Sequence, residues 1–114
     1  MKSLVLVFVV SLFCFSSFAH ADIAVGKAKY NQFCVACHGA TGAGDGAASA
    51  ALNPKPPSFR NKAFFQSRTD AHLAKVIKDG GAANKLSALM PAWRSSLSDA
   101  EIKSVIEYIH TFAK

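Results

Sequence analysis

The stretch Cys34-Val35-Ala36-Cys37-His38 decides how this chain of 114 residues is built. Its two cysteines are three positions apart, and a histidine follows the second one directly. Side chains at i and i+3 on a helical turn point the same way, so both thiols can reach the two vinyl groups on one edge of a porphyrin and form thioethers. His38 then lies under the ring, where its neutral imidazole can bind iron. This pattern is typical of covalent c-type haem attachment.

Three other interpretations of the cysteine pair have less support. A thioredoxin-like redox dithiol needs a βαβ context, whereas the flanking segments have helical patterns. A structural zinc site needs four ligands, and only His72 and His110 could join the motif, at no familiar zinc spacing. A disulfide between Cys34 and Cys37 would close a loop too small to stabilise the fold much.

Residues 1–21 have the pattern of a secretory signal. Lys2 supplies a positive charge, an apolar run covers residues 4–15, and Ala-His-Ala at residues 19–21 forms a small-x-small cleavage site. Serines interrupt the apolar run, which is shorter than the roughly 18 residues that a membrane span needs. We therefore expect export to the periplasm, removal of residues 1–21, no stable membrane insertion, and one mature domain over residues 22–114.

The 93 residues of this mature segment are basic and poor in large apolar side chains. They carry 12 Lys and Arg against 7 Asp and Glu, which gives a net charge of +5. Of their 43 apolar residues 18 are alanine, so only 25 larger apolar side chains can form a core. Small domains with so little to bury generally need a disulfide, a metal or another non-protein insert.

Helical periodicity surrounds the motif. A pattern over residues 23–38 puts Gly26, Tyr30 and both cysteines on one face of a single helix. An interior glycine costs a helix about 1 kcal/mol relative to alanine, so Gly26 is either a tolerated weak position or a place where another backbone crosses closely. Residues 39–46 contain four glycines and predict a flexible turn, without the lysine that a phosphate-binding loop requires.

The rest of the chain predicts two more helices and long loops. We expect a short helical turn at residues 47–52 and an extended, proline-rich loop at residues 53–58. A helix over residues 70–79 is capped at its start and ended by glycine. The last helix begins at a capping box formed by Ser98 and Glu101 and runs towards residue 113. No segment has a strand pattern, so the predicted architecture is all-α.

Met90 is the candidate for the sixth ligand of the iron. It is the only methionine of residues 22–114 and is followed by Pro91 in a predicted loop, 52 residues after His38. A His and Met ligand pair favours ferrous iron and raises the reduction potential. A lone methionine is otherwise usually core filler, but its place in a loop argues against that.

Residues 22–114 resemble the small class I cytochromes c over nearly their whole length. The resemblance rests on the motif, the glycine-rich run after it, the segment Met90-Pro91-Ala92-Trp93, and the first and last helices. In that family these helices cross at a contact between glycine and aromatic residues, which four positions match: Gly26, Tyr30, Val105 and Tyr108. The resemblance implies an all-α class I cytochrome c fold, with three to four helices wrapped around one covalently bound haem c.

The same resemblance implies the site and the activity. Cys34 and Cys37 would attach the haem, and His38 and Met90 would bind its iron. The family also implies a periplasmic, monohaem, one-electron carrier that is not itself an enzyme.

Other side chains around the haem are less certain from the resemblance. Family members often orient the ligand imidazole through a hydrogen bond to a backbone carbonyl, and support of that kind fixes a ligand. Three prolines are equal candidates for this carbonyl: Pro54, Pro56 and Pro57. Four aromatic residues either line the haem cavity or pack in an ordinary core: Phe59, Phe64, Phe65 and Trp93. Trp93 could also donate its indole N–H to a haem propionate.

Basic residues suggest how such a carrier would find its partners. Four of them form a stretch without an acid, and two more flank the segment around Met90: Lys55, Arg60, Lys62 and Arg68, then Lys85 and Arg94. If they surround the exposed haem edge, they steer the protein, expected to be a monomer, towards acidic redox partners. Otherwise they are scattered solubilising charges. Nucleic acid is a poor partner because the chain is exported and only modestly charged.

Two functions stay open at this stage. The chain is either an electron relay, as a free shuttle or as a subunit of an oxidase or dehydrogenase system, or a haem protein with a labile Met90 that binds gas or peroxide. The Met90-Pro91 pair favours the relay. His72 and His110 are substitute ligands in principle, but both lie in predicted helices and are expected to face solvent.

Overall fold

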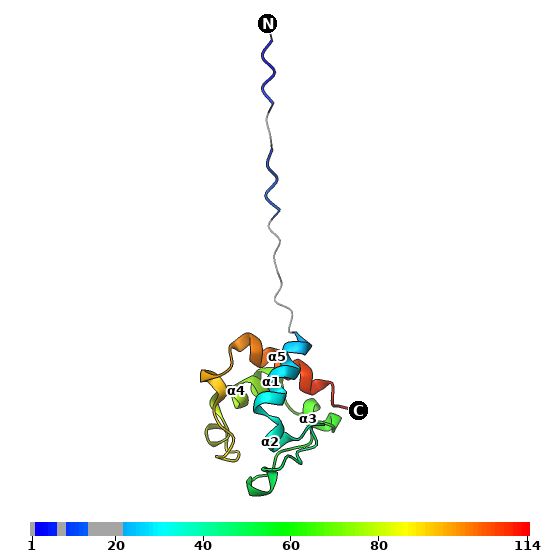
Figure 1. Ribbon diagram of the computed structural model, residues 1–114, viewed down its shortest axis with the longest axis vertical. Helices are drawn as coiled ribbons and strands as arrows, with labels where there is room; N and C mark the ends of the chain where they lie inside the picture. The colour runs from blue at the N-terminus through cyan, green and yellow to red at the C-terminus, as the bar shows by residue number, and fades with distance from the viewer. Residues whose placement is uncertain (1, 7–8, 14–21) are drawn as a thin grey trace.

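The computed structural model describes residues 2–6, 9–13 and 22–114 (Figure 1). The predicted cleavage site at residues 19–21 and Cys14 lie outside the described residues. Within them there are helices and loops but no strand, which confirms the all-α prediction. None of the helices in these ranges has the length and apolar character needed to cross a membrane.

Five α-helices and three short 3-10 turns make up the domain. The elements in chain order are α1 (Ile23–Phe33), α2 (Val35–His38), η1 (Ser49–Ala51), α3 (Lys62–Gln66), α4 (Asp70–Asp79), η2 (Ala82–Asn84), η3 (Trp93–Ser95) and α5 (Asp99–His110). Figure 1 shows α1 and α5 crossing, with α4 beside them and the motif helix α2 below α1.

Gly26 lies where α1 crosses α5, so the prediction of a close backbone approach is confirmed. A Cβ atom at Gly26 would stand 2.0 Å from the carbonyl oxygen of Ser104 and 3.0 Å from the Cβ of Tyr108. One turn along α1, the fully buried Tyr30 packs edge-on against Tyr108 with 5.4 Å between ring centroids. Aromatic pairs of this kind contribute about 0.5–1.5 kcal/mol beyond their buried area.

The single helix predicted over residues 23–38 is wrong, because the chain forms two helices there. Cys34 has φ −116° and ends α1, and α2 begins at Val35. The Cys34 N–H still donates to the Tyr30 carbonyl at 2.9 Å, and the Cys34 carbonyl accepts from the His38 N–H at 2.8 Å. The apolar periodicity of the sequence does not register a break that costs so few hydrogen bonds.

The predicted start of α5 is confirmed. The Ser98 hydroxyl accepts from the Glu101 N–H at 3.1 Å, and the Glu101 carboxylate accepts from the Ser98 N–H at 3.0 Å. The helix ends at His110, earlier than predicted. Its apolar face forms much of the core, whose buried residues are Tyr30, Phe59, Phe64, Leu73, Leu97, Ile102, Val105, Ile106 and Ile109.

The middle of the chain agrees with the prediction except at α3. Helix α4 has the predicted bounds, with the Thr69 hydroxyl as its cap and Gly80, at φ 83°, as its end. The short turn η1 and the extended loop after it are also as predicted. Helix α3 was missed, although Asn61 is a favoured capping residue and accepts from the Ala63 N–H at 3.0 Å.

Candidate functional site

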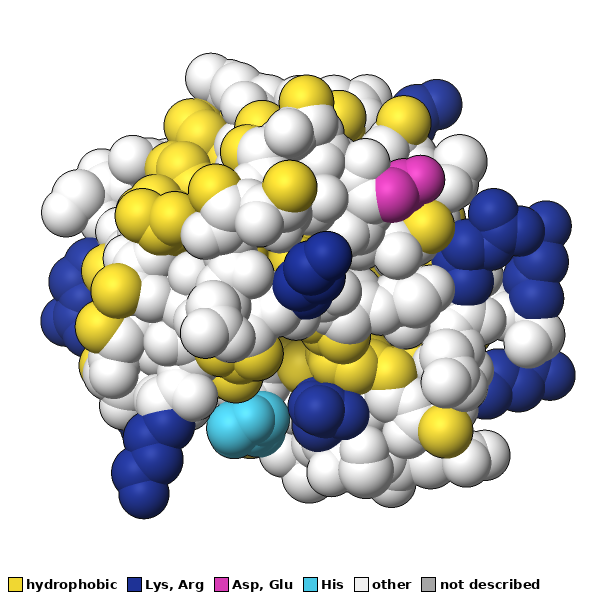
Figure 2. Space-filling view, turned by 90° about the horizontal axis from the view of Figure 1, so that it is seen from below, with side chains coloured by type: hydrophobic (Ala, Val, Ile, Leu, Met, Phe, Trp, Pro, Cys, Tyr) yellow, Lys and Arg dark blue, Asp and Glu magenta, His cyan; other side chains and the backbone are white. Residues whose placement is uncertain are grey.

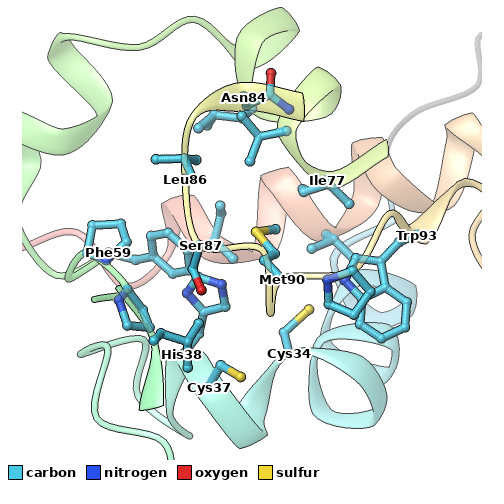
Figure 3. Close-up of a pocket in the computed structure, with 18 of the residues that line it drawn as sticks. Cys34, Cys37, His38, Phe59, Ile77, Asn84, Leu86, Ser87, Met90 and Trp93 are labelled. Atoms are coloured by element: carbon cyan, nitrogen blue, oxygen red, sulfur yellow. The ribbon is translucent and has the colours of Figure 1, made fainter. Parts of the chain in front are cut away.

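A cavity of about 550 Å³ brings the predicted site residues together (Figure 3). Cys34, Cys37 and His38 line it on the side of α2, and Met90 lines it from the loop between α4 and η3. Figure 3 shows the motif and this loop on opposite sides of the space, with the sulfur atoms drawn between them. The volume is typical of sites for small organic molecules.

The two cysteines are free thiols rather than a disulfide. Burial, together with the nearby Cys37, raises the pKa of the Cys34 thiol to about 12. A thiolate would therefore be costly at this wall. An uncharged thioether suits such an apolar environment, so the cysteine pair fits covalent attachment of a haem.

His38 has the properties of a metal ligand. Burial lowers the pKa of its imidazole to about 4, so the ring is neutral near pH 7 and keeps a lone pair for a metal. The ring stacks on Phe59 at 4.8 Å between centroids. Its Nδ1 atom is buried and has no hydrogen-bond partner among the described residues. Such an atom is costly unless it gains a partner, and a bound haem iron would engage this ring.

The predicted hydrogen bond from His38 to a proline carbonyl is not formed among the described residues. Pro54, Pro56 and Pro57 all line the same cavity. The choice among them stays a prediction.

The glycine-rich loop at residues 39–46 is bound to the motif helix. The Gly44 N–H donates to the His38 carbonyl at 2.8 Å, and the Gly46 N–H donates to the Cys37 carbonyl at 3.1 Å. The last carbonyls of a helix have no partner within that helix, so these amides cap α2. The segment predicted to be a flexible turn thus fixes the backbone that carries His38.

The loop that carries Met90 is held by residues that sequence reasoning missed. The Met90 N–H donates to the Ser87 carbonyl at 3.1 Å, and the Gly81 N–H donates to the Met90 carbonyl at 3.0 Å. Ser87 is buried, and a Cβ atom at Gly81 would stand 1.8 Å from the Ser87 carbonyl oxygen. The consecutive glycines Gly80 and Gly81 were the available signal, since close backbone approach is a common reason for glycine in a loop.

Three of the four predicted aromatic residues line the cavity, namely Phe59, Phe64 and Trp93. Phe65 is not among the lining residues, and its ring packs against His110 at 4.3 Å. Trp93 packs against Phe33 at 5.0 Å. The hydrogen bond from its indole to a propionate stays a prediction.

Basic residues occupy part of the cavity wall. Lys55 and Arg68 line it and are exposed, as is His72. The Arg68 guanidinium also lies 4.3 Å from the centre of the Phe64 ring. Figure 2 shows a face of the molecule on which Lys and Arg side chains surround hollowed apolar surface, with little acidic surface between them.

Two residues considered from the sequence are engaged elsewhere. Arg94, expected to flank the Met90 segment as part of a basic surface, forms an ion pair with Asp79. His110 is only partly exposed, and its Nε2 lies 2.7 Å from a carboxylate oxygen of Asp70. Neither histidine outside the motif is opposite His38 in the way that Met90 is (Figure 3).

Known proteins share this sequence. Residues 21–109 match the family described as cytochrome c oxidase, cbb3-type, subunit III. The chain is 35% identical over 88 residues to the cbb3-type cytochrome c oxidase subunit CcoP of Azospirillum sp. (strain B510), covering 77% of this chain and 28% of that protein. It is 31% identical over 90 residues to subunit FixP of Bradyrhizobium diazoefficiens, covering 79% of this chain and 27% of that protein.

The chain thus spans about a quarter of the length of these curated relatives. The family match extends over most of the described domain, from the start of α1 almost to the end of α5. With its helical fold and a cavity that fits the cofactor, the chain belongs to the cbb3-type cytochrome c oxidase subunit III family and is a c-type cytochrome domain that binds haem c covalently.

Proposed function

We propose that the chain is a periplasmic, monohaem one-electron carrier in which Cys34 and Cys37 attach the haem and His38 and Met90 bind its iron. The observation that carries this proposal is the cavity itself. It brings a neutral imidazole and a thioether to opposite walls (Figure 3), although the two residues are 52 positions apart in the sequence.

The haem supplies a one-electron iron couple when it is bound. The protein supplies fixed surroundings for that couple. Capping of α2 by residues 39–46 holds the His38 backbone, and the hydrogen bonds of Ser87 and Gly81 hold Met90. Apolar walls from Phe59 and Leu73 exclude water from the cavity. Because both ligand positions are fixed in advance, little has to rearrange when an electron arrives or leaves.

The start of α1 supports the proposed processing of the chain. The Asp22 carboxylate accepts from the Ala24 N–H at 2.9 Å and caps α1, and the Asp22 N–H donates to the Ser104 hydroxyl at 3.1 Å. The packed domain therefore includes the residue that follows the predicted cleavage site. We propose that residues 1–21 are a signal and that residues 22–114 form the periplasmic carrier.

The proposed partners are redox proteins with acidic docking surfaces. Lys55 and Arg68 at the cavity wall would meet them. The relatives are described as subunits of cbb3-type cytochrome c oxidases. We therefore propose that this chain, as a monomer, passes electrons within a respiratory system of that kind, either as a free shuttle or bound to an oxidase.

Substitution of Met90 tests the proposal. In the ferric protein, Met90→Ala should abolish the near-infrared band that arises from methionine bound to iron, and it should lower the midpoint potential because the thioether favours ferrous iron. Mass spectrometry should find the haem still attached, since the cysteines are unchanged.

Leu89→Ala is the matched control, because Leu89 precedes Met90 in the same loop and is 60% exposed. It should keep both the band and the potential. Unchanged spectra and potential in Met90→Ala would contradict the proposed ligand. Tight binding of cyanide by the wild-type protein, with a high-spin spectrum beforehand, would instead show an open iron site.

A further inference from the structure

The loop formed by residues 80–92, here called the Met90 loop, closes on itself where it leaves and rejoins the fold. The Gly81 N–H donates to the Met90 carbonyl at 3.0 Å. A Cβ atom at Gly80 would stand 2.8 Å from the backbone nitrogen of Ala92. The outgoing and returning backbones are thus in contact immediately outside the cavity.

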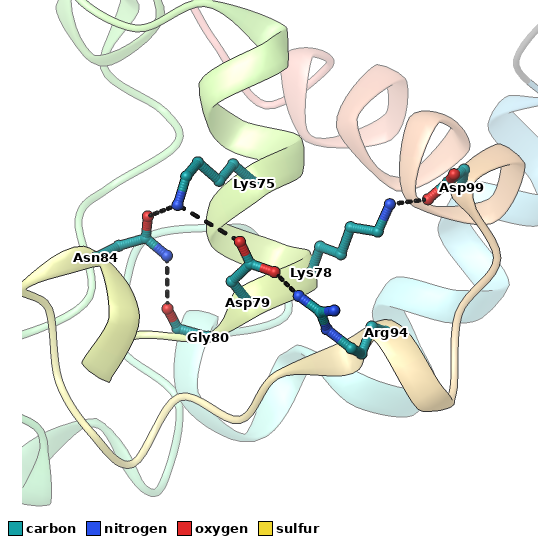
Figure 4. A network of polar contacts seen from close by, with 7 residues as sticks. All are labelled: Lys75, Lys78, Asp79, Gly80, Asn84, Arg94 and Asp99. Atoms are coloured by element: carbon teal, nitrogen blue, oxygen red, sulfur yellow. Dashed lines mark hydrogen bonds and ion pairs between the residues drawn. The ribbon is translucent and has the colours of Figure 1, made fainter.

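An ion pair joins the two residues that flank this closed base. Asp79 is the last residue of α4, and Arg94 lies in η3 after the loop has returned. One carboxylate oxygen of Asp79 pairs with the Arg94 guanidinium, and the other lies 3.4 Å from the Lys75 ammonium (Figure 4). Opening the Met90 loop by moving η3 away from α4 would separate Asp79 from Arg94.

Lys75 extends the connection into the loop itself. Its ammonium lies 3.3 Å from the Asn84 side-chain oxygen, and the Asn84 amide donates to the Gly80 carbonyl at 2.7 Å (Figure 4). The Asp79 side chain is only 23% exposed, although Lys75 and Arg94 remain more than half exposed. The carboxylate is therefore the common partner of both cations, and partly shielded from solvent.

Such a network matters more for local opening than for global unfolding. Exposed ion pairs contribute little to the stability of a whole domain. Loops, however, open with small free energies, well below that of global unfolding. An ion pair that must break in every opening event therefore changes the fraction of open molecules by a measurable factor.

We propose that the Asp79–Arg94 ion pair acts as a latch on the Met90 loop and sets how often Met90 leaves the cavity. This inference rests on the proposed function, in which Met90 is an axial ligand. Asp79 and Arg94 are positioning residues, because neither lines the cavity. An external ligand such as imidazole can bind the iron only when Met90 has left, so its apparent affinity rises with the open fraction.

The test compares ferric holoprotein variants in two measurements. Hydrogen exchange of the Gly81 amide, read by NMR, reports loop opening, and a titration with imidazole reports release of Met90. Asp79→Asn removes the partner of both cations and should speed exchange and tighten imidazole binding roughly two- to fivefold, the range of an exposed ion pair. Arg94→Gln should have a smaller effect in the same direction, and Arg94→Lys should restore part of it.

Asp99→Asn is the matched control. Asp99 pairs with Lys78 at 2.7 Å, also between α4 and a later segment, but this pair ties α4 to α5 and not to the Met90 loop (Figure 4). Asp99→Asn should therefore leave exchange at Gly81 and imidazole binding unchanged. The double variant Asp79→Asn/Arg94→Gln should show no more opening than Asp79→Asn alone, because the two residues share one interaction.

The outcomes separate the latch from the proposed function. Unchanged Gly81 exchange in Asp79→Asn and Arg94→Gln overturns the latch. Faster exchange with unchanged imidazole affinity, in a protein that shows the methionine-to-iron band, also overturns it. If the wild-type protein lacks that band, the proposed ligation by Met90 is wrong and the claim that the ion pair governs its release is overturned with it, whatever the exchange rates show.

Discussion

At the scale of single residues, Gly26 shows how one missing side chain permits the fold. Its Cα faces the backbone of α5, and a Cβ atom would overlap the Ser104 carbonyl at 2.0 Å. We predict that Gly26→Ala destabilises the holoprotein by about 1–3 kcal/mol, the usual cost of overpacking. This loss should exceed the gain of about 1 kcal/mol in helix propensity. Thermal unfolding followed by circular dichroism measures the difference.

Lys27→Ala is the control for Gly26→Ala, because Lys27 is the next residue of α1 and is exposed. It should change the unfolding temperature little. A Gly26→Ala protein as stable as the wild type would mean that α1 and α5 can separate without cost, which the observed contact contradicts.

At the scale of elements, Glu101 links the start of α5 to α1. Hydrogen bonding to Lys29, followed by the Ser98 N–H, lowers the pKa of its carboxyl to about 2, and the Lys29 ammonium lies 2.8 Å away. The pKa is lower in the folded than in the unfolded chain, so this stabilisation is present above about pH 4.3 and is lost as the pH falls towards 2. We predict that Glu101→Gln unfolds at a lower temperature than the wild type at pH 7, with the difference shrinking across that interval.

A second substitution separates the two contributions at Glu101. Lys29→Gln removes the leading cause of the low pKa but keeps the capping box. In this background the acid-dependent part of the Glu101→Gln effect should be smaller. A difference between wild type and Glu101→Gln that stays constant from pH 7 to pH 2 would show that the carboxylate charge does not stabilise this helix junction.

At the scale of the whole molecule, the distribution of charge decides how partners are met. Lys55 and Arg68 are exposed at the cavity wall. We predict that the second-order rate constant for electron transfer with an acidic redox protein falls as ionic strength rises towards 0.1 M, where charges are screened beyond about 10 Å. Stopped-flow kinetics over a salt series measures this dependence.

Lys55→Gln should lower the rate at low salt and flatten its salt dependence. Lys103→Gln, which removes a charge that does not line the cavity, should have a smaller effect. A rate constant that ignores ionic strength would remove electrostatic steering from the account of this protein.

The local features of this protein could be predicted from the sequence alone. The Cys34–His38 motif specifies covalent haem attachment because its chemistry lies within five consecutive residues. The start of α5 and the bounds of α4 were predictable because caps and helical periodicity are local signals. Gly26 was recognisable because glycine inside a helix is costly unless a close neighbour requires it.

Only the tertiary structure decided the features that join distant parts of the chain. It placed Met90 across the cavity from His38, broke the first helix at Cys34, and bound residues 39–46 to the carbonyls of α2. It also paired Asp79 with Arg94 at the base of the Met90 loop. Such contacts depend on the path of loops, which follows from packing the whole domain and leaves no periodic pattern in the sequence.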